Sequence, residues 1–176
     1  MRCSVDGAAL AAELTRRVPS VKSVFLNVNP RPGNVVLGPE WIRLAGRPYL
    51  EDTLCGLKFR LSPGGFFQVN HAQATKLYSK AVEFAAPEAG DNVLELYAGV
   101  GAMGMMLASR AARVWAVEES VQAVRDGIEC AGLNGVANIR FLAARCEDAL
   151  AGRHPRQEME GKPLVVRQGS EHQILT

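Results

Sequence analysis

The sequence predicts an α/β protein in which an incomplete Rossmann-like parallel sheet follows a small α+β module. From residue 70 onward, apolar runs typical of strands alternate with segments of helical periodicity, a pattern typical of parallel sheets with right-handed crossovers. Before residue 63, short extended runs are separated by turn signals such as Pro32-Gly33 and Gly38-Pro39. We therefore expect domains at 1–62 and 63–150, followed by a polar tail at 151–176 that is either unstructured or a degraded strand.

The first module is predicted to begin with one helix. Asp6 is a suitable N-cap, and Leu10, Leu14 and Val18 recur at helical spacing. Short extended runs follow, which is the pattern of a small antiparallel sheet. These runs are VKSVFLNVN at 21–29, NVVLG at 34–38, WIRLAG at 41–46 and LKFRLS at 57–62.

The second domain is predicted to alternate helices and strands. Asn70 is the cap of a first helix, with Gln73 three positions later, and an apolar stripe of 3.6-residue period follows it. Ser120 caps a later helix, which ends at Asn134-Gly135. The other expected elements are a strand at 92–97, a helix at 102–110, a strand at 113–117 and a strand at 138–143.

Composition is globular: the 176 residues are 48% apolar and 22% charged. No apolar run approaches the length of a membrane span, and the N-terminus lacks a signal-peptide core, so we expect a cytoplasmic protein without membrane contact. The cysteines lie far apart without a C-x-x-C pair, which indicates reduced thiols and disfavours a metal site. They are Cys3, Cys55, Cys130 and Cys146.

Charge is distributed unevenly along the chain. Residues 1–62 hold nine lysines and arginines against five acidic residues, whereas residues 63–150 hold seven against ten. A basic first third is compatible with a partner that carries phosphates, although scattered surface lysines and arginines are the commoner explanation for such a balance.

A glycine motif occupies the turn from the strand at 92–97 into the next helix. Gly99, Gly101 and Gly104 satisfy G-x-G-x-x-G, and bare glycines there let the backbone approach a ligand at the helix N-terminus. Glu118 ends the next strand 19 residues after the first glycine. A carboxylate at this position can accept hydrogen bonds from both hydroxyls of a ribose.

Two ligand classes fit this motif, a dinucleotide and S-adenosylmethionine. Glu95 lies at the carboxyl end of the first strand, where it would repel a pyrophosphate but attract a cationic amino group. Tyr97 offers a flat apolar wall beside the site. These two residues favour S-adenosylmethionine as the cofactor.

Several segments together resemble the RNA uracil-5-methyltransferase family. They are SPGGFFQVNHAQATKLY, NVLELYAGVGAMGMMLA, VWAVE and NGVANIRF. The resemblance extends from about residue 21 to 150 and implies a Rossmann-like S-adenosylmethionine methyltransferase fold. It also implies an enzyme that methylates C5 of uridine in 23S ribosomal RNA or transfer RNA. The segment FLNVNPRPGNVVLG looks more like the ribosomal RNA branch.

The resemblance also implies roles for individual residues. Gln68 would hydrogen-bond S-adenosylmethionine, and Phe66 would lie against the target uracil. Tyr97 and Gly99–Gly101 would line the cofactor, and Glu118 would bind its ribose. The aromatic ring of Phe66 suits stacking against a base taken out of an RNA helix.

Two further positions qualify this assignment. Ala102 stands where relatives carry asparagine, so one polar contact to the cofactor is expected to be missing. Phe66 and Phe67 are adjacent, and we expect one of the two to pack in the core.

The resemblance implies catalytic groups that this sequence lacks. Family members add a cysteine thiolate to C6 of uracil, and a general base later removes the C5 proton. Their nucleophile lies in an S-C-N-P segment after a D-P-P-R motif, and none of the four cysteines has that context. We therefore expect no catalytic residue here and interpret the chain as a truncated member. The alternatives are a cofactor- or RNA-binding remnant that needs a partner, and an NAD-binding oxidoreductase fragment.

The predicted sheet also has an open side. In doubly wound methyltransferases the first strand is central, but here the strand at 92–97 has a predicted neighbour on one side only. An open apolar edge is a template for pairing with another chain. We expect homodimerisation or aggregation rather than insertion of tail residues 164–166, because Leu164-Val165-Val166 is short and lies between Pro163 and Arg167.

Overall fold

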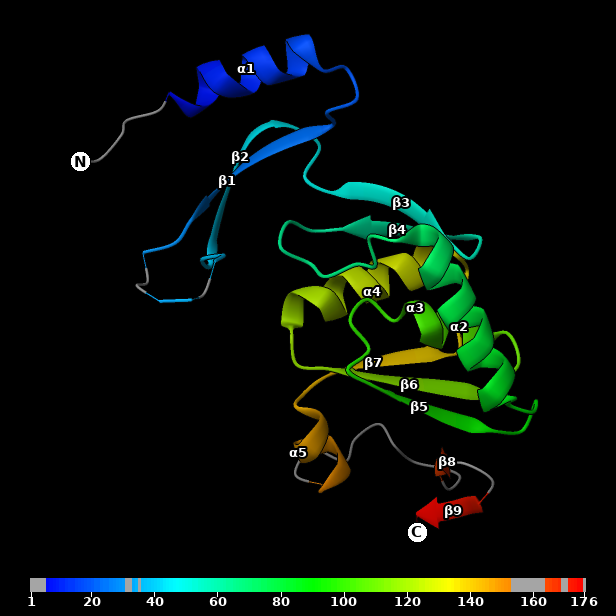
Figure 1. The fold of residues 1–176 in the computed structure, drawn as a ribbon. Coiled ribbons are helices and arrows are strands. Elements are labelled where there is room, and N and C mark those ends of the chain that lie inside the picture. The colour runs from blue at the N-terminus through cyan, green and yellow to red at the C-terminus, as the bar shows by residue number, and fades with distance from the viewer. Residues whose placement is uncertain (1–5, 31–32, 35, 153–163, 169–170, 176) are drawn as a thin grey trace. The chain divides into compact units, whose positions relative to one another are not determined.

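The computed structural model describes residues 6–30, 33–34, 36–152, 164–168 and 171–175 (Figure 1). The chain forms two compact units. The first comprises Met1–Glu51 and Leu61–Gly64, and the second comprises Asp52–Arg60 and Gly65–Thr176. Among the described residues, no helix is both long and apolar enough to cross a membrane.

The first unit contains one helix and one antiparallel strand pair. Helix α1 (Gly7–Arg17) is capped as predicted, because the Asp6 carboxylate accepts hydrogen bonds from the amides of Ala8 and Ala9 at 3.1 and 3.2 Å. Strand β1 (Ser23–Val28) pairs with β2 (Glu40–Gly46), and the register shifts after Val24. The strands expected within 21–29 and 41–46 are thereby confirmed.

The extended run expected at 34–38 is wrong for its described residues, which form no strand. The Asn27 side chain explains the difference. Its amide nitrogen donates to the carbonyls of Gly38 and Glu40 at 2.9 and 3.0 Å, and its oxygen accepts from the Gly38 amide at 2.7 Å. A side chain of β1 therefore takes the backbone groups that a further strand would offer to a ladder.

Strands β3 (Leu50–Leu54) and β4 (Leu57–Leu61) form a hairpin, of which only β4 was expected. Both turn residues have positive φ, 53° at Cys55 and 80° at Gly56. Two such residues are typical of the type I′ turn that matches the twist of paired strands. The charged sequence of β3 gives no apolar alternation, so only its pairing with β4 reveals it.

The hairpin is bonded to a helix of the second unit, α4 (Val121–Leu133). The Lys58 amide donates to the Asn134 side chain at 2.8 Å, and that side chain donates back to the Lys58 carbonyl at 2.7 Å. The Arg60 amide donates to the Cys130 sulfur at 3.2 Å. These bonds connect residues 52–60 to the second unit. The domain boundaries expected at 62 and 150 stay predictions.

The second unit contains the expected parallel sheet. Strands β5 (Asn92–Leu96), β6 (Arg113–Glu118) and β7 (Ile139–Ala143) are parallel in the order β5-β6-β7. The four residues Val114–Val117 of the central strand are buried. This is the near-continuous burial expected of a parallel strand.

Three helices lie on the same side of this sheet in Figure 1. They are α2 (His71–Ala85), α3 (Ala102–Ala108) and α4. The predicted caps form, because Asn70 accepts from the Gln73 amide at 3.1 Å and Ser120 accepts from the Ala123 amide at 3.3 Å. The predicted order of strands and helices is confirmed.

The last elements are α5 (Cys146–Leu150), β8 (Leu164–Gln168) and β9 (Glu171–Leu175). A strand is present at 164–168, in agreement with one of the two alternatives predicted for the tail. This strand pairs antiparallel with β9 and is not part of the parallel ladder. Among the described residues, β5 is therefore the hydrogen-bonding edge of the parallel sheet, and β8 lies in contact with β5 without joining its ladder. Dimerisation or aggregation through that edge stays a prediction.

Candidate functional site

The glycine loop, defined as residues 97–101, connects β5 to α3. Tyr97, Gly99 and Gly101 all have positive φ, of 55°, 56° and 71°. A Cβ added at Gly99 would meet nothing within 4 Å, whereas one at Gly101 would lie 2.6 Å from the Phe141 ring. Gly99 thus leaves open space beside the backbone, and Gly101 permits close packing against β7.

The third glycine serves packing within the helix. A Cβ on Gly104 would lie 2.4 Å from a Glu95 carboxylate oxygen and 3.1 Å from Ile139. The absence of a side chain lets α3 approach the strands closely, which is the role expected of the last glycine in this motif.

Glu118 lies at the glycine loop, as expected from its position at the end of β6. One carboxylate oxygen accepts from the Gly99 amide at 2.9 Å, and the other accepts from the Ser120 amide at 2.8 Å. The two bonds fix the orientation of the carboxylate. Each oxygen retains acceptor capacity, so the group can still receive hydroxyl donors from a ligand.

Glu95 points its carboxyl group inward from β5. An oxygen accepts a hydrogen bond from the Gly104 amide at 3.0 Å. Burial raises the pKa of Glu95 to about 8, and the bond from Gly104 opposes this rise only in part. The group is therefore mostly neutral at pH 7, and a cationic ligand nearby would favour its ionised form. Its contact with a cofactor amino group stays a prediction.

Tyr97 joins the glycine loop to α5. Its amide donates to the buried Cys146 sulfur at 3.2 Å, and its phenol donates to Glu147 Oε1 at 3.1 Å. No local sequence motif connects Glu147 with Tyr97, because 50 residues separate the two. Only the fold brings them together.

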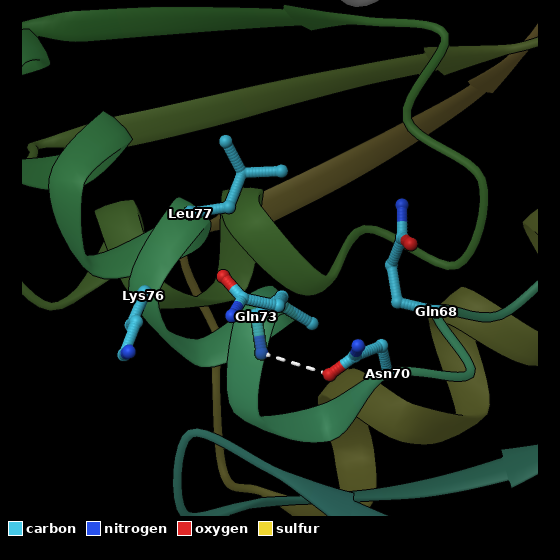
Figure 2. Close-up of a pocket in the computed structure, with 6 residues that line it drawn as sticks. Gln68, Asn70, Gln73, Lys76 and Leu77 are labelled. Carbon is cyan, nitrogen blue, oxygen red and sulfur yellow. Dashed lines mark hydrogen bonds between the residues drawn. The ribbon is translucent and has the colours of Figure 1, made fainter.

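Gln68 lies beside an open pocket of about 470 Å³ in front of α2 (Figure 2). The other lining residues are Asn70, Gln73, Ala74, Lys76 and Leu77. Burial and the negative charge of Glu95 raise the pKa of the nearby Tyr78 phenol, and the Gln68 side chain opposes this rise. Tyr78 therefore lies within electrostatic reach of both Gln68 and Glu95, although no glycine-loop residue lines the pocket itself.

The two adjacent phenylalanines differ in burial, as predicted: one packs against the core and the other is exposed. Phe66 is 77% exposed, whereas the Phe67 ring packs against Phe59 with centroids 5.0 Å apart and planes at 49°. Phe59 is itself buried. Phe66 is thus the one of the two that is available to a ligand.

The described cysteines occupy structural positions. Cys130 and Cys146 are buried, and Cys55 is half-buried in the hairpin turn; Cys3 lies outside the described residues. Burial raises the pKa of the Cys130 thiol, which makes it a poorer nucleophile near neutral pH. Within the described ranges, no three His, Cys, Asp or Glu side chains are grouped to hold a metal ion.

Comparison with known proteins finds similar sequences and similar solved structures. The family model "tRNA (Uracil-5-)-methyltransferase" matches residues 47–164. An uncharacterized RNA methyltransferase of Caldanaerobacter subterraneus is 32% identical over 94% of this chain and 37% of its own length. One of Oceanobacillus iheyensis is 38% identical over 78% of this chain and 30% of its own length. The chain thus spans about a third of these relatives.

A solved structure supports the same relationship. It is the Pyrococcus abyssi tRNA (uracil-54, C5)-methyltransferase in complex with S-adenosyl-L-homocysteine. The match has a TM-score of 0.62 and 26% sequence identity, and it covers 74% of this chain and 32% of the other. The Rossmann-like fold expected from the sequence is therefore confirmed.

Proposed function

Because this chain belongs to the tRNA (uracil-5-)-methyltransferase family, we propose that it binds S-adenosylmethionine at the glycine loop and serves the methylation of RNA. The observation that carries the proposal is the pairing of an open Gly99 with the oriented Glu118 carboxylate 2.9 Å from its amide. Bare backbone beside a fixed acceptor suits the ribose and amino acid parts of such a cofactor.

The residues around the loop fit this cofactor. A side chain at Gly99 would fill the open space there, and Tyr97 presents a 72% exposed aromatic ring. We assign Gly99, Gly101 and Tyr97 to its lining and Glu118 to its ribose. Gln68 and Glu95 are further candidates, because both lie near the Tyr78 phenol. When bound, the cofactor supplies an electrophilic methyl group on a sulfonium centre.

The proposed substrate is C5 of a uridine in RNA, with 23S ribosomal RNA favoured over transfer RNA on the segment FLNVNPRPGNVVLG. The exposure of Phe66 supports a stacking role toward a base turned out of its helix. The Pyrococcus abyssi relative acts on tRNA, as its name states, so transfer RNA is the competing substrate.

We further propose that this chain by itself holds the cofactor without completing the reaction. Addition of a thiolate to C6 needs an accessible cysteine of lowered pKa, and Cys130 and Cys146 are buried. The chain would then act with a partner that supplies the nucleophile and the base. The test of function must therefore separate binding from turnover.

Isothermal titration with S-adenosylmethionine and with NAD tests the proposed cofactor. We expect heat of binding with S-adenosylmethionine only, since the chain belongs to a methyltransferase family. With methyl-labelled cofactor and a uridine-containing ribosomal RNA fragment, we expect no label at C5. Preferential binding of NAD would contradict the cofactor assignment. Labelled C5 would contradict the proposed incompleteness and make Cys146 the first residue to substitute.

Replacing Glu118 with alanine should weaken S-adenosylmethionine binding by about 1–3 kcal/mol, which corresponds to roughly 5- to 150-fold in Kd. The substitution removes the ribose acceptor and also the bonds to the Gly99 and Ser120 amides. Titration calorimetry on both variants measures the change. The exposed neighbour Glu119 provides the control: Glu119→Ala removes the same charge and should leave Kd nearly unchanged. Unchanged affinity in Glu118→Ala would refute the ribose assignment.

A further inference from the structure

We infer that Glu147 is a positioning residue of the glycine loop, which acts by holding the side chain of Tyr97 through its phenol. The inference rests on the proposed function for the identity of the ligand, but the contact itself is a property of this chain. Glu147 lies on α5, outside the glycine motif.

The backbone of Tyr97 needs external support. Its φ of 55° lies in the left-handed region, which residues with a Cβ rarely adopt. The Cys146 sulfur accepts the Tyr97 amide at 3.2 Å and lies 3.9 Å from the Val117 carbonyl of β6. The buried first residue of α5 thus anchors the loop backbone at the carboxyl ends of two strands.

The side chain of Tyr97 is held by the next residue of α5. The ring is 72% exposed, so packing against the protein restrains it little. Its phenol donates a hydrogen bond to Glu147 Oε1 at 3.1 Å. Arg145 Nε lies 3.8 Å from the Glu147 carboxylate on its other oxygen, and Asp148 adds a negative charge nearby. The carboxylate is therefore shared between the phenol and one exposed guanidinium.

The consequence is a ring whose orientation is set before a ligand arrives. An exposed aromatic side chain without a partner loses rotational freedom when it packs against a ligand, and this loss weakens binding. A phenol already bonded to Glu147 has lost part of that freedom. Removal of the Glu147 carboxylate should therefore weaken a ligand at the glycine loop by roughly two- to tenfold.

A double-mutant cycle tests this mechanism with S-adenosylhomocysteine as the calorimetric probe. We expect Glu147→Ala to raise Kd two- to tenfold and Glu147→Gln, which keeps an acceptor oxygen, to restore most of the affinity. In a Tyr97→Phe background, Glu147→Ala should have no further effect. Glu88→Ala is the matched control, because it removes an exposed carboxylate before the opposite end of β5 and should leave Kd unchanged. An equal effect of Glu147→Ala in both backgrounds would overturn the inference.

A second readout needs no ligand. The hydrogen bond to Glu147 raises the pKa of the Tyr97 phenol, and the difference between wild type and Tyr97→Phe in ultraviolet absorbance at alkaline pH isolates this phenol from the other two tyrosines. We expect its pKa to fall in Glu147→Ala. An unchanged phenol pKa would overturn the positioning role of Glu147 but leave the proposed cofactor site standing. Absence of S-adenosylhomocysteine binding by the wild type would overturn the proposed function, and with it the positioning role, whatever the titration gives.

Discussion

Replacing Glu95 with glutamine should raise the free energy of unfolding by roughly 2–5 kcal/mol at pH 8–9 and change it little below pH 4.5. Burial raises the pKa of Glu95 to about 8 from the ordinary value of 4.5. Between these two pH values the folded chain keeps a proton that the unfolded chain releases. The contribution of the neutral Glu95 carboxyl group to the free energy of unfolding is therefore fully present below pH 4.5. It is lost as the pH rises through 8.

Glutamine tests this titration because it stays neutral and keeps a carbonyl oxygen to accept the bond from the Gly104 amide. Urea unfolding followed by circular dichroism from pH 4 to 9 would measure both variants. Wild type should lose stability across this range relative to Glu95→Gln. The exposed Glu88 supplies the control, and Glu88→Gln should keep the slope of the wild type. Parallel pH profiles for wild type and Glu95→Gln would show that Glu95 ionises normally.

Replacing Gly101 with alanine should lower the free energy of unfolding by about 2–5 kcal/mol and abolish detectable cofactor binding. Its φ of 71° would cost a residue with a Cβ about 1–2 kcal/mol. The added Cβ would also lie 2.6 and 2.7 Å from two atoms of the Phe141 ring, and overpacking of this kind costs about 1–3 kcal/mol. Relief of the clash would displace either Phe141 or the glycine loop. Displacement of the loop would alter the open space beside Gly99.

Two glycines of similar conformation separate strain from overpacking. Gly99 and Gly135 have φ of 56° and 67°, and an added Cβ at either would meet nothing within 4 Å. Urea unfolding should show a loss of about 1–2 kcal/mol for Gly99→Ala and for Gly135→Ala. Only Gly99→Ala should also weaken cofactor binding. Equal stability of Gly101→Ala and Gly135→Ala would mean that Phe141 moves aside without cost.

The sequence by itself determined most helices and strands of the sheet domain and the principal loop. The caps at Asp6, Asn70 and Ser120 formed where they were expected, because a cap depends on residues two or three positions apart. The parallel order of the three strands followed from their alternation with helices. The 19-residue spacing from the glycine motif to Glu118 placed the carboxylate at the loop, since successive parallel strands end at the same edge.

Only the tertiary structure decided the features that depend on distant partners. The β3–β4 hairpin is bonded to α4 by Lys58 and Asn134, which are 76 residues apart, and Tyr97 meets Glu147 across 50. The packing partner Phe59 distinguishes Phe67 from the exposed Phe66. The raised pKa of Glu95 likewise follows from burial. Periodicity and capping report on neighbours along the chain, whereas burial and long-range bonds exist only once the sheet and its helices have assembled.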